Sequence, residues 1–233
     1  MFPTLRAAFF AAAFAIPVLF APAAPAATRP DGLVPVRLRG LDEAYLLPRA
    51  DLRPYTRVLL EGARVSYRKG WLRDANERGA TLSGRVSEAD ARAFLDAAQS
   101  GFDVEWAEAF RAAGYEIVAS PGEGVLRVAP RVVDLSVSAP STTTTGIERS
   151  YTTQAGEATL ELEVRDSVSG ELLGRIRDHR GTMKSPTLQR AFAGDSERDF
   201  RRLFGRWAEL AARELGTLRT LSPLPGTLAP GPR

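Results

Sequence analysis

Apolar residues recur three and four positions apart in two long segments of the chain. The first segment is 87–114, and the second, with the more regular pattern, is 194–218. Such spacing places apolar side chains on one side of a helix, so both segments are predicted to be amphipathic helices with one buried face. We expect the second helix to begin at Asp195 or Ser196. The apolar positions are Ala91, Phe94, Leu95, Ala98, Phe102, Ala109, Phe110 and Ala113 in the first segment and Phe200, Leu203, Phe204, Trp207, Leu210, Ala211 and Leu215 in the second.

The ends of the first helix carry capping signals. Ser87 is followed three residues later by Asp90, a short-armed version of the capping box. Gly114 stands where a helix commonly ends on a left-handed residue. Gly101 lies inside the pattern and lowers helix stability by about 1 kcal/mol relative to alanine, so a break into two helices is the alternative.

Alternation of apolar and polar residues along 158–165, and again after a turn along 172–177, predicts a β-hairpin whose even-numbered positions are buried. The connecting segment 166–170 has an odd number of residues, which keeps buried positions opposite buried positions. Gly170 suits the positive φ of a turn followed by a bulge. In this register Glu161 faces Arg175 on the solvent side.

Three further segments are rich in β-forming residues. They are 56–68, the short 115–118, and 125–138, where the buried parity changes and a bulge near 130–132 is predicted. Pro130 suggests a local edge or break in the ladder. The polar segment 69–85 is expected to be a surface loop.

The order of these elements predicts an α+β fold: a mixed sheet of about five strands with two main amphipathic helices packed on one face. The strand in 56–68 and the strand in 115–118 are expected to be joined by a right-handed parallel crossover. We assign a single α+β domain to 51–218, preceded by an extended lead-in at 28–50 with at most a short edge strand, and followed by a disordered proline-rich tail at 219–233.

The N-terminal segment 1–27 has the layout of a signal peptide. A single charge at Arg6 precedes an apolar run, and Ala24 and Ala26 occupy the two small-residue positions before a cut. A retained membrane anchor is the alternative, because the apolar run approaches the length of a span. Pro17 and the Ala-Pro repeat favour cleavage, which predicts a periplasmic or secreted protein with no stable membrane anchor.

The composition narrows the function classes. The chain has no cysteine, which excludes disulfides, thiolate nucleophiles, thiolate metal sites and lipid attachment at a cysteine. The 31 basic and 28 acidic residues nearly balance, so the net charge does not indicate a nucleic-acid partner. An arginine patch for anionic lipid or polysaccharide is the alternative interpretation of the basic residues.

The sequence identifies no catalytic, cofactor-binding or metal-ligating residue. The only histidine, His179, has outward parity at the end of an edge-like strand, and its neighbours Asp178 and Arg180 are expected to be solvated. Carboxylate pairs can serve a glycosidase. Strand ends are where such residues are sought, and the acids there are Asp134, Asp166, Glu171 and Asp178.

Four stretches in order resemble a bacterial envelope family catalogued as domain-of-unknown-function family 3313. They are ADLRPYTRVLLEGARVSYRKG, GYEIVASPGEGVLRVAPRVVDLSV, EATLELEVRDSVSGELLGRIRD and RWAELAARE, and together they cover about residues 50–218. The resemblance implies an exported protein. Many members are lipoproteins, a pattern from which this cysteine-free chain departs, and the family implies no reaction.

These observations lead us to expect a non-catalytic envelope protein that binds another envelope protein, of unknown identity, without a cofactor. The contact is expected at an exposed sheet edge or at the long threonine-rich segment 139–156. One alternative is an envelope-glycan hydrolase with paired carboxylates facing each other across a pocket. Another is an auxiliary factor for lipid or polysaccharide transport, which requires an apolar groove on the outer sheet face instead of charged residues.

Overall fold

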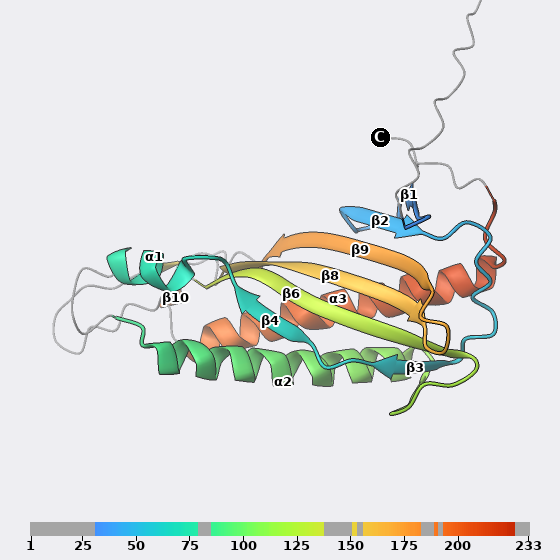
Figure 1. Cartoon of the computed structure of the whole chain (residues 1–233). Helices are drawn as coiled ribbons and strands as arrows, with labels where there is room; N and C mark the ends of the chain where they lie inside the picture. The colour runs from blue at the N-terminus through green and yellow to red at the C-terminus, as the bar shows by residue number, and fades with distance from the viewer. Residues whose placement is uncertain are drawn as a thin grey trace, which may run out of the picture.

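The computed structural model describes residues 31–78, 85–137, 151–152, 156–182, 189–190 and 193–226. A long sheet lies against two long helices, with a short helix at one end (Figure 1). The helices are α1 (Trp71–Arg78), α2 (Glu88–Ala112) and α3 (Ala193–Leu221). The strands are β1 (Val34–Val36), β2 (Glu43–Leu46), β3 (Arg57–Leu60), β4 (Arg64–Tyr67), β5 (Glu116–Ile117), β6 (Val125–Val137), β7 (Tyr151–Thr152), β8 (Gly156–Asp166), β9 (Leu172–Gly181) and β10 (Gln189–Arg190).

The main sheet is mixed and larger than predicted. Its strand order is β1-β2-β9-β8-β6-β3-β5, with β4 also paired to β6, and β7 and β10 form a separate pair. The neighbours β6, β8 and β9 are antiparallel, whereas β3 and β4 run parallel to β6, and β5 runs parallel to β3. The α+β class is confirmed, and the parallel pairing of β3 with β5 agrees with the predicted crossover.

The segment 28–50 is more than an extended lead-in. Its strands β1 and β2 extend the sheet beyond β9, so β9 is an inner strand and not an edge. Leu33, Ala44 and Leu46 are buried. The prediction of at most one edge strand was therefore wrong for β2, because the prolines of this segment are tolerated in turns and in the edge strand β1.

The strand predicted at 56–68 is divided into β3 and β4. Leu60 is opposite Val128 and Arg64 is opposite Arg131, so Pro130 of β6 lies where the neighbouring edge is interrupted. A proline without an N–H is tolerated at such a gap, as the sequence suggested. The bulge itself lies between Val133 and Ser136, farther along than predicted.

The polar segment 69–85 contains the helix α1, which corrects the prediction of a surface loop. Trp71 begins this helix and is almost fully buried; its indole N–H donates to the backbone oxygen of Val137 at 3.0 Å. The ring stacks on Tyr67 of β4, with centroids 4.0 Å apart. One aromatic residue thus fixes this helix to the end of the sheet.

Helices α2 and α3 lie side by side on one face of the sheet, as predicted, and run in the same direction (Figure 1). The capping box of Ser87 and Asp90 is present, and α2 continues through Gly101 without a break. Phe102 stacks on Trp106 at 4.8 Å and packs on Phe204 at 5.2 Å. Burial of each such side chain contributes about 1.5–3 kcal/mol to the stability of the fold. The two helices are therefore held mainly by apolar contacts with each other and with the sheet.

The hairpin of β8 and β9 keeps the predicted parity but not the predicted register. Glu161 is opposite Arg177, and Glu163, not Glu161, is opposite Arg175. Two one-residue steps account for the shift. Asp166 is bonded to Glu171 across the turn, one residue later than predicted, and the register irregularity between Val164 and Arg165 places one more residue in β9. Gly170 has a φ of 73°, as predicted for the turn.

The C-terminal tail does not begin at 219. Helix α3 continues to Leu221, and Leu224 is buried with its N–H bonded to the backbone oxygen of Ala50 at 2.9 Å. Ser222 also joins this contact, since its hydroxyl accepts from the N–H of Leu52 at 3.1 Å. The start of the proline-rich segment is therefore bonded to the connection between β2 and β3.

Candidate functional site: the open sheet face and the helix groove

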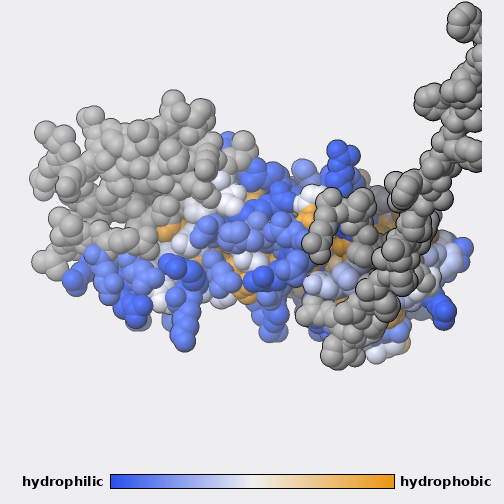
Figure 2. All heavy atoms as spheres, turned by 90° about the horizontal axis from the view of Figure 1, so that it is seen from above, coloured by the Kyte–Doolittle hydropathy of each residue, from blue (hydrophilic) through white to orange (hydrophobic). Residues whose placement is uncertain are grey.

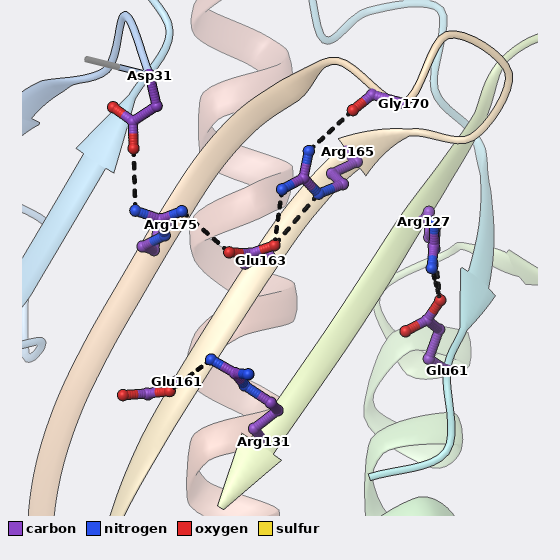
Figure 3. A network of polar contacts seen from close by, with 9 residues as sticks. All are labelled: Asp31, Glu61, Arg127, Arg131, Glu161, Glu163, Arg165, Gly170 and Arg175. Carbon is purple, nitrogen blue, oxygen red and sulfur yellow. Dashed lines mark hydrogen bonds and ion pairs between the residues drawn. The ribbon is translucent and has the colours of Figure 1, made fainter. Parts of the chain in front are cut away.

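The face of the molecule drawn in Figure 2 is predominantly hydrophilic, and apolar residues appear on it only as small separate spots. The sheet face opposite the helices carries rows of charged side chains that point toward the viewer in Figure 3, with a helix behind the strands. This open face, as we call it, is formed by the outward residues of β6, β8 and β9. The predicted solvated outer face is therefore present.

The charged residues of the open face pair across the strands. Glu161 of β8 contacts Arg131 at 2.8 Å and Arg177 at 3.8 Å. A second group links Asp31, Arg175, Glu163 and Arg165 through contacts of 2.9–3.0 Å (Figure 3). The middle strand β8 therefore supplies both glutamates and also Arg165, the flanking strands β6 and β9 supply the other guanidinium groups, and Asp31 adds a carboxylate from before β1.

Glu163 is the most constrained carboxylate of this network. Partial burial raises its pKa, but hydrogen bonds from Arg165 and Arg175 outweigh burial and hold the pKa below its ordinary value. Arg165 also donates to the backbone oxygen of Gly170 at 2.9 Å. The open face is thus a self-neutralised surface, and an apolar groove for lipid is not formed by its described residues.

The predicted outward orientation of His179 is confirmed, although its strand β9 is an inner strand and not an edge. Its side chain is 54% exposed, and Nε2 lies 3.7 Å from a carboxylate oxygen of Glu157 that is equally exposed. Nδ1 is 3.1 Å from the hydroxyl of Thr159. The imidazole and the Glu157 carboxylate beside it are both exposed, and the buried Thr159 contributes only a hydroxyl, so these described contacts form no sheltered substrate position.

Asp178, by contrast, was expected in solvent and is completely buried. Its carboxylate accepts from the indole N–H of Trp207 at 2.7 Å, from the backbone N–H of Asp42 at 3.0 Å and from the guanidinium of Arg180. Asp42 in turn accepts from the backbone N–H of His179 at 2.9 Å. The carboxylate therefore ties α3, β9 and the turn before β2 together, a structural task that the even parity of position 178 already indicated.

The other carboxylates named from the sequence do not gather around Asp178. Asp166 lies in the hairpin turn, where it accepts from the backbone N–H groups of Val168 and Ser169 and from the hydroxyl of Tyr55, and these bonds lower its pKa. Asp178 is opposite Leu160 of β8, and Asp166 lies six residues further along that strand, so the two acids are about 20 Å apart. Glu171 follows the same turn, and Asp134 is exposed at the bulge of β6.

A small apolar cavity of about 40 Å³ lies between the sheet and α3. Its walls include Leu46, Leu162, Leu173, Ile176 and Leu215. The volume exceeds that of a single water position by only a few times, so the cavity is a local packing gap and not a ligand pocket.

A larger depression, the α2–α3 groove, follows the outer seam between the two helices and encloses about 540 Å³. Its small residues are Ala109, Ala112, Ala113, Gly205, Ala212 and Gly216, and its charged residues are Glu105, Glu108, Glu209 and Arg213. Because small side chains line the seam, the helix backbones are accessible there. Sequence periodicity identified Ala109 and Ala113 only as core positions, and it missed the groove.

The charges of the groove are unevenly compensated. Arg213 contacts Glu214 at 3.4 Å. For Glu105, Glu108 and Glu209, no ion pair with another described residue is formed. One oxygen of Glu105 lies over Gly205, only 2.9 Å from the place a β-carbon would occupy. The groove therefore presents carboxylates from both helices beside a floor of small residues.

The family model described as "Protein of unknown function (DUF3313)" matches residues 31–210. The chain belongs to this family. The match begins before β1, so in this DUF3313 domain the two N-terminal strands are part of the family unit. No curated protein matches the sequence.

Solved structures resemble this DUF3313 domain only distantly. A PelC dodecamer from Paraburkholderia phytofirmans has 9% identity and a TM-score of 0.37 over 72% of this chain and 94% of that one. A neuraminyllactose-binding hemagglutinin homolog from Helicobacter pylori has 8% identity and a TM-score of 0.38 over 76% and 90%. A minor lipoprotein from Acinetobacter baumannii has 11% identity and a TM-score of 0.31 over 71% and 93%. Similarity at this level carries no information on function.

Within residues 31–78, 85–137, 156–182 and 193–226, no group of three or more histidine and acidic side chains is arranged to hold a metal ion. Within the same ranges, no helix combines the length and apolarity needed to cross a membrane. The predicted signal peptide at 1–27 and most of the threonine-rich segment 139–156 lie outside the described residues.

Proposed function

We propose that this DUF3313 domain is an exported, non-catalytic protein of the bacterial envelope that binds another envelope protein, and that the α2–α3 groove is the docking surface. The observation that carries the proposal is the concave seam of alanine and glycine residues on the helix side facing away from the sheet. Small residues let another chain approach the helix backbones closely. The signal-like pattern of residues 1–27 supports export.

The remaining surfaces favour binding less. On the open face, a partner would have to displace water from ion pairs that already satisfy one another, which costs more than it returns. The edge strand β1 is three residues long and contains Pro35, and β5 at the other end has two residues. Short edges of this kind resist addition of a further strand. The edge docking expected from the sequence therefore has less support than the groove.

An envelope-glycan hydrolase is the second candidate, because acids from both helices border the groove. A glycosidase needs one carboxyl group held in the protonated form by burial or by a close like charge. Glu108 and Glu209 are both exposed and lie beside an open seam. These surroundings support catalysis less than they support binding, and release of sugar from purified envelope glycan, lost in Glu209→Gln, would establish the hydrolase instead.

A variant that fills the groove tests the proposal. A β-carbon at Gly216 has no heavy atom within 4 Å, so Gly216→Leu projects into the groove without a clash in the fold. Thr217→Gln on the same helix is the control, because Thr217 is exposed and does not line the groove. Tagged full chain is cross-linked in the native envelope, and captured proteins are identified by mass spectrometry.

We expect one partner to be captured by the unmodified protein and by Thr217→Gln, and to be lost with Gly216→Leu. Thermal unfolding of each variant verifies that the fold is retained. Equal capture by the Leu variant, or recovery of monomer alone in every case, contradicts the proposal.

A further inference from the structure

We infer that the α2–α3 groove takes a basic segment of a protein partner, whose lysine or arginine side chains lie between the carboxylates of the two helices. This inference deepens the proposed function and rests on it for the location of the docking surface. The carboxylates concerned are Glu105 and Glu108 of α2 and Glu209 of α3.

The charge of the groove is the first argument. The chain as a whole carries a net charge of +3, so three uncompensated carboxylates around one depression do not follow from an acidic composition. In the described part of the chain, most arginines of the open face are bound to acids there, and Arg213, the only basic residue lining the groove, contacts Glu214. Like charges held on facing helices repel one another, and cations of a partner relieve that repulsion.

The order of residues along the groove is the second argument. Glu105 faces Gly205 at one end, Glu108 and Glu209 follow one turn later, and Ala112, Ala212 and Gly216 continue the floor without further acids. From Glu105 to Ala113 the groove extends about 12 Å, or a little over two helical turns. A partner segment with two basic residues about one turn apart, followed by small or apolar residues, complements both parts.

The geometry also excludes a purely apolar occupant. Glu105 holds a carboxylate oxygen over Gly205, 2.9 Å from the place a β-carbon would occupy. An apolar segment in this place would desolvate that carboxylate without providing a partner for it, which is unfavourable. A guanidinium or ammonium group supplies the missing donor.

The test uses a defined probe and the full chain. The probe is a fluorescein-labelled, alanine-based helical peptide with lysine at every fourth position, and its analogue has glutamate in the same places. Fluorescence anisotropy measures the dissociation constant for the unmodified protein and for the triple variant Glu105→Gln, Glu108→Gln, Glu209→Gln. The control triple variant, Glu43→Gln, Glu116→Gln, Glu171→Gln, removes the same charge at exposed positions elsewhere.

We expect the groove variant to weaken binding of the lysine peptide about tenfold or more, while the control variant leaves it within about twofold. Raising the salt from about 50 mM to about 300 mM should weaken binding to the unmodified protein and have less effect on the groove variant. The glutamate peptide should not bind.

Three results separate the inference from the proposed function. Absence of binding, or equal loss in both triple variants, overturns the inference. Loss in the groove variant with full binding to Gly216→Leu also overturns it, because the peptide then associates with the acids without entering the groove. If native partner capture depends on Gly216 but not on the three glutamates, the docking surface stands and its basic occupant is wrong.

Discussion

Replacement of Asp178 by asparagine should reveal how much stability depends on one buried carboxylate. In the native protein its two oxygens accept from Trp207, Asp42 and Arg180, and none of its surface is exposed. Asparagine keeps a similar volume but offers one acceptor oxygen and one NH₂ group. Whichever way the amide is oriented, at least one of these donors then faces another donor.

The magnitude follows from these contacts. A buried donor left without an acceptor costs about 1–3 kcal/mol, and hydrogen bonds to a neutral acceptor are each weaker by about 1 kcal/mol than those to a carboxylate. Arg180 is about one third exposed, so water compensates part of its loss. We therefore expect Asp178→Asn to lower the free energy of unfolding by about 3 kcal/mol, a large fraction of the 5–15 kcal/mol typical of a domain.

Urea unfolding followed by tryptophan fluorescence and by circular dichroism measures this difference. Glu157→Gln on the exposed end of β8 is the matched control and should remain within about 0.5 kcal/mol of the unmodified protein. In a double-mutant cycle with Trp207→Phe, the two changes should couple, because they remove the same hydrogen bond. A loss below about 1 kcal/mol for Asp178→Asn, or full additivity with Trp207→Phe, would refute this account of the contact.

Three further predictions concern single side chains. Tyr115→Phe should leave thermal stability unchanged or raised, because its buried hydroxyl has no hydrogen-bond partner among the described residues, whereas Tyr55→Phe should cost about 1–2 kcal/mol in urea unfolding by removing the bond to Asp166. Gly216→Ala should raise the free energy of unfolding by about 1 kcal/mol, since it improves helix propensity where the added carbon meets nothing within 4 Å. The stability difference between the unmodified protein and Glu163→Gln should be fully present at neutral pH and disappear as the pH falls below the ordinary glutamate range, because the folded-state pKa of Glu163 is lowered; a pH-independent difference between the two unfolding curves would contradict it.

The main helices and the central hairpin were predictable because each depends on local periodicity. The apolar stripe around Trp207 and the even parity of β8 and β9 are consequences of burying one face, and they appear directly in the order of residues. The parity rule also assigned position 178 to the buried side. The expectation that Asp178 is solvated was wrong because three donors from distant segments satisfy its carboxylate at this buried position.

What the sequence did not predict depends on contacts between distant segments. A one-residue change at the turn and a one-residue bulge in β9 together shift Glu161 from Arg175 to Arg177. The two steps preserve parity, so no alternation pattern distinguishes the two registers. The pairing of β2 with β9 joins residues more than 125 positions apart. Helix α1 is short and polar, and it is held by contacts outside its own sequence: Trp71 and Ala75 are buried, and the side chain of Asn76 bonds the backbone of Val86.

The charge distribution explains why overall composition indicated no binding surface. Arginine is abundant, yet Arg131, Arg175 and Arg177 are opposite carboxylates on neighbouring strands of the open face. Arg165 contacts Glu163 on its own strand, so these arginines contribute to no basic patch. Because the strands of this sheet bring arginines and glutamates together, the charges of the open face are neutralised locally by ion pairs. Glu105, Glu108 and Glu209 form no such pairs with other described residues, and small residues of α2 and α3 lie beside them where the outer surfaces of the two helices meet. A chain with a slight positive charge thereby acquires a negative groove, and recognition of a basic partner depends on which residues the fold leaves unpaired and not on the net charge.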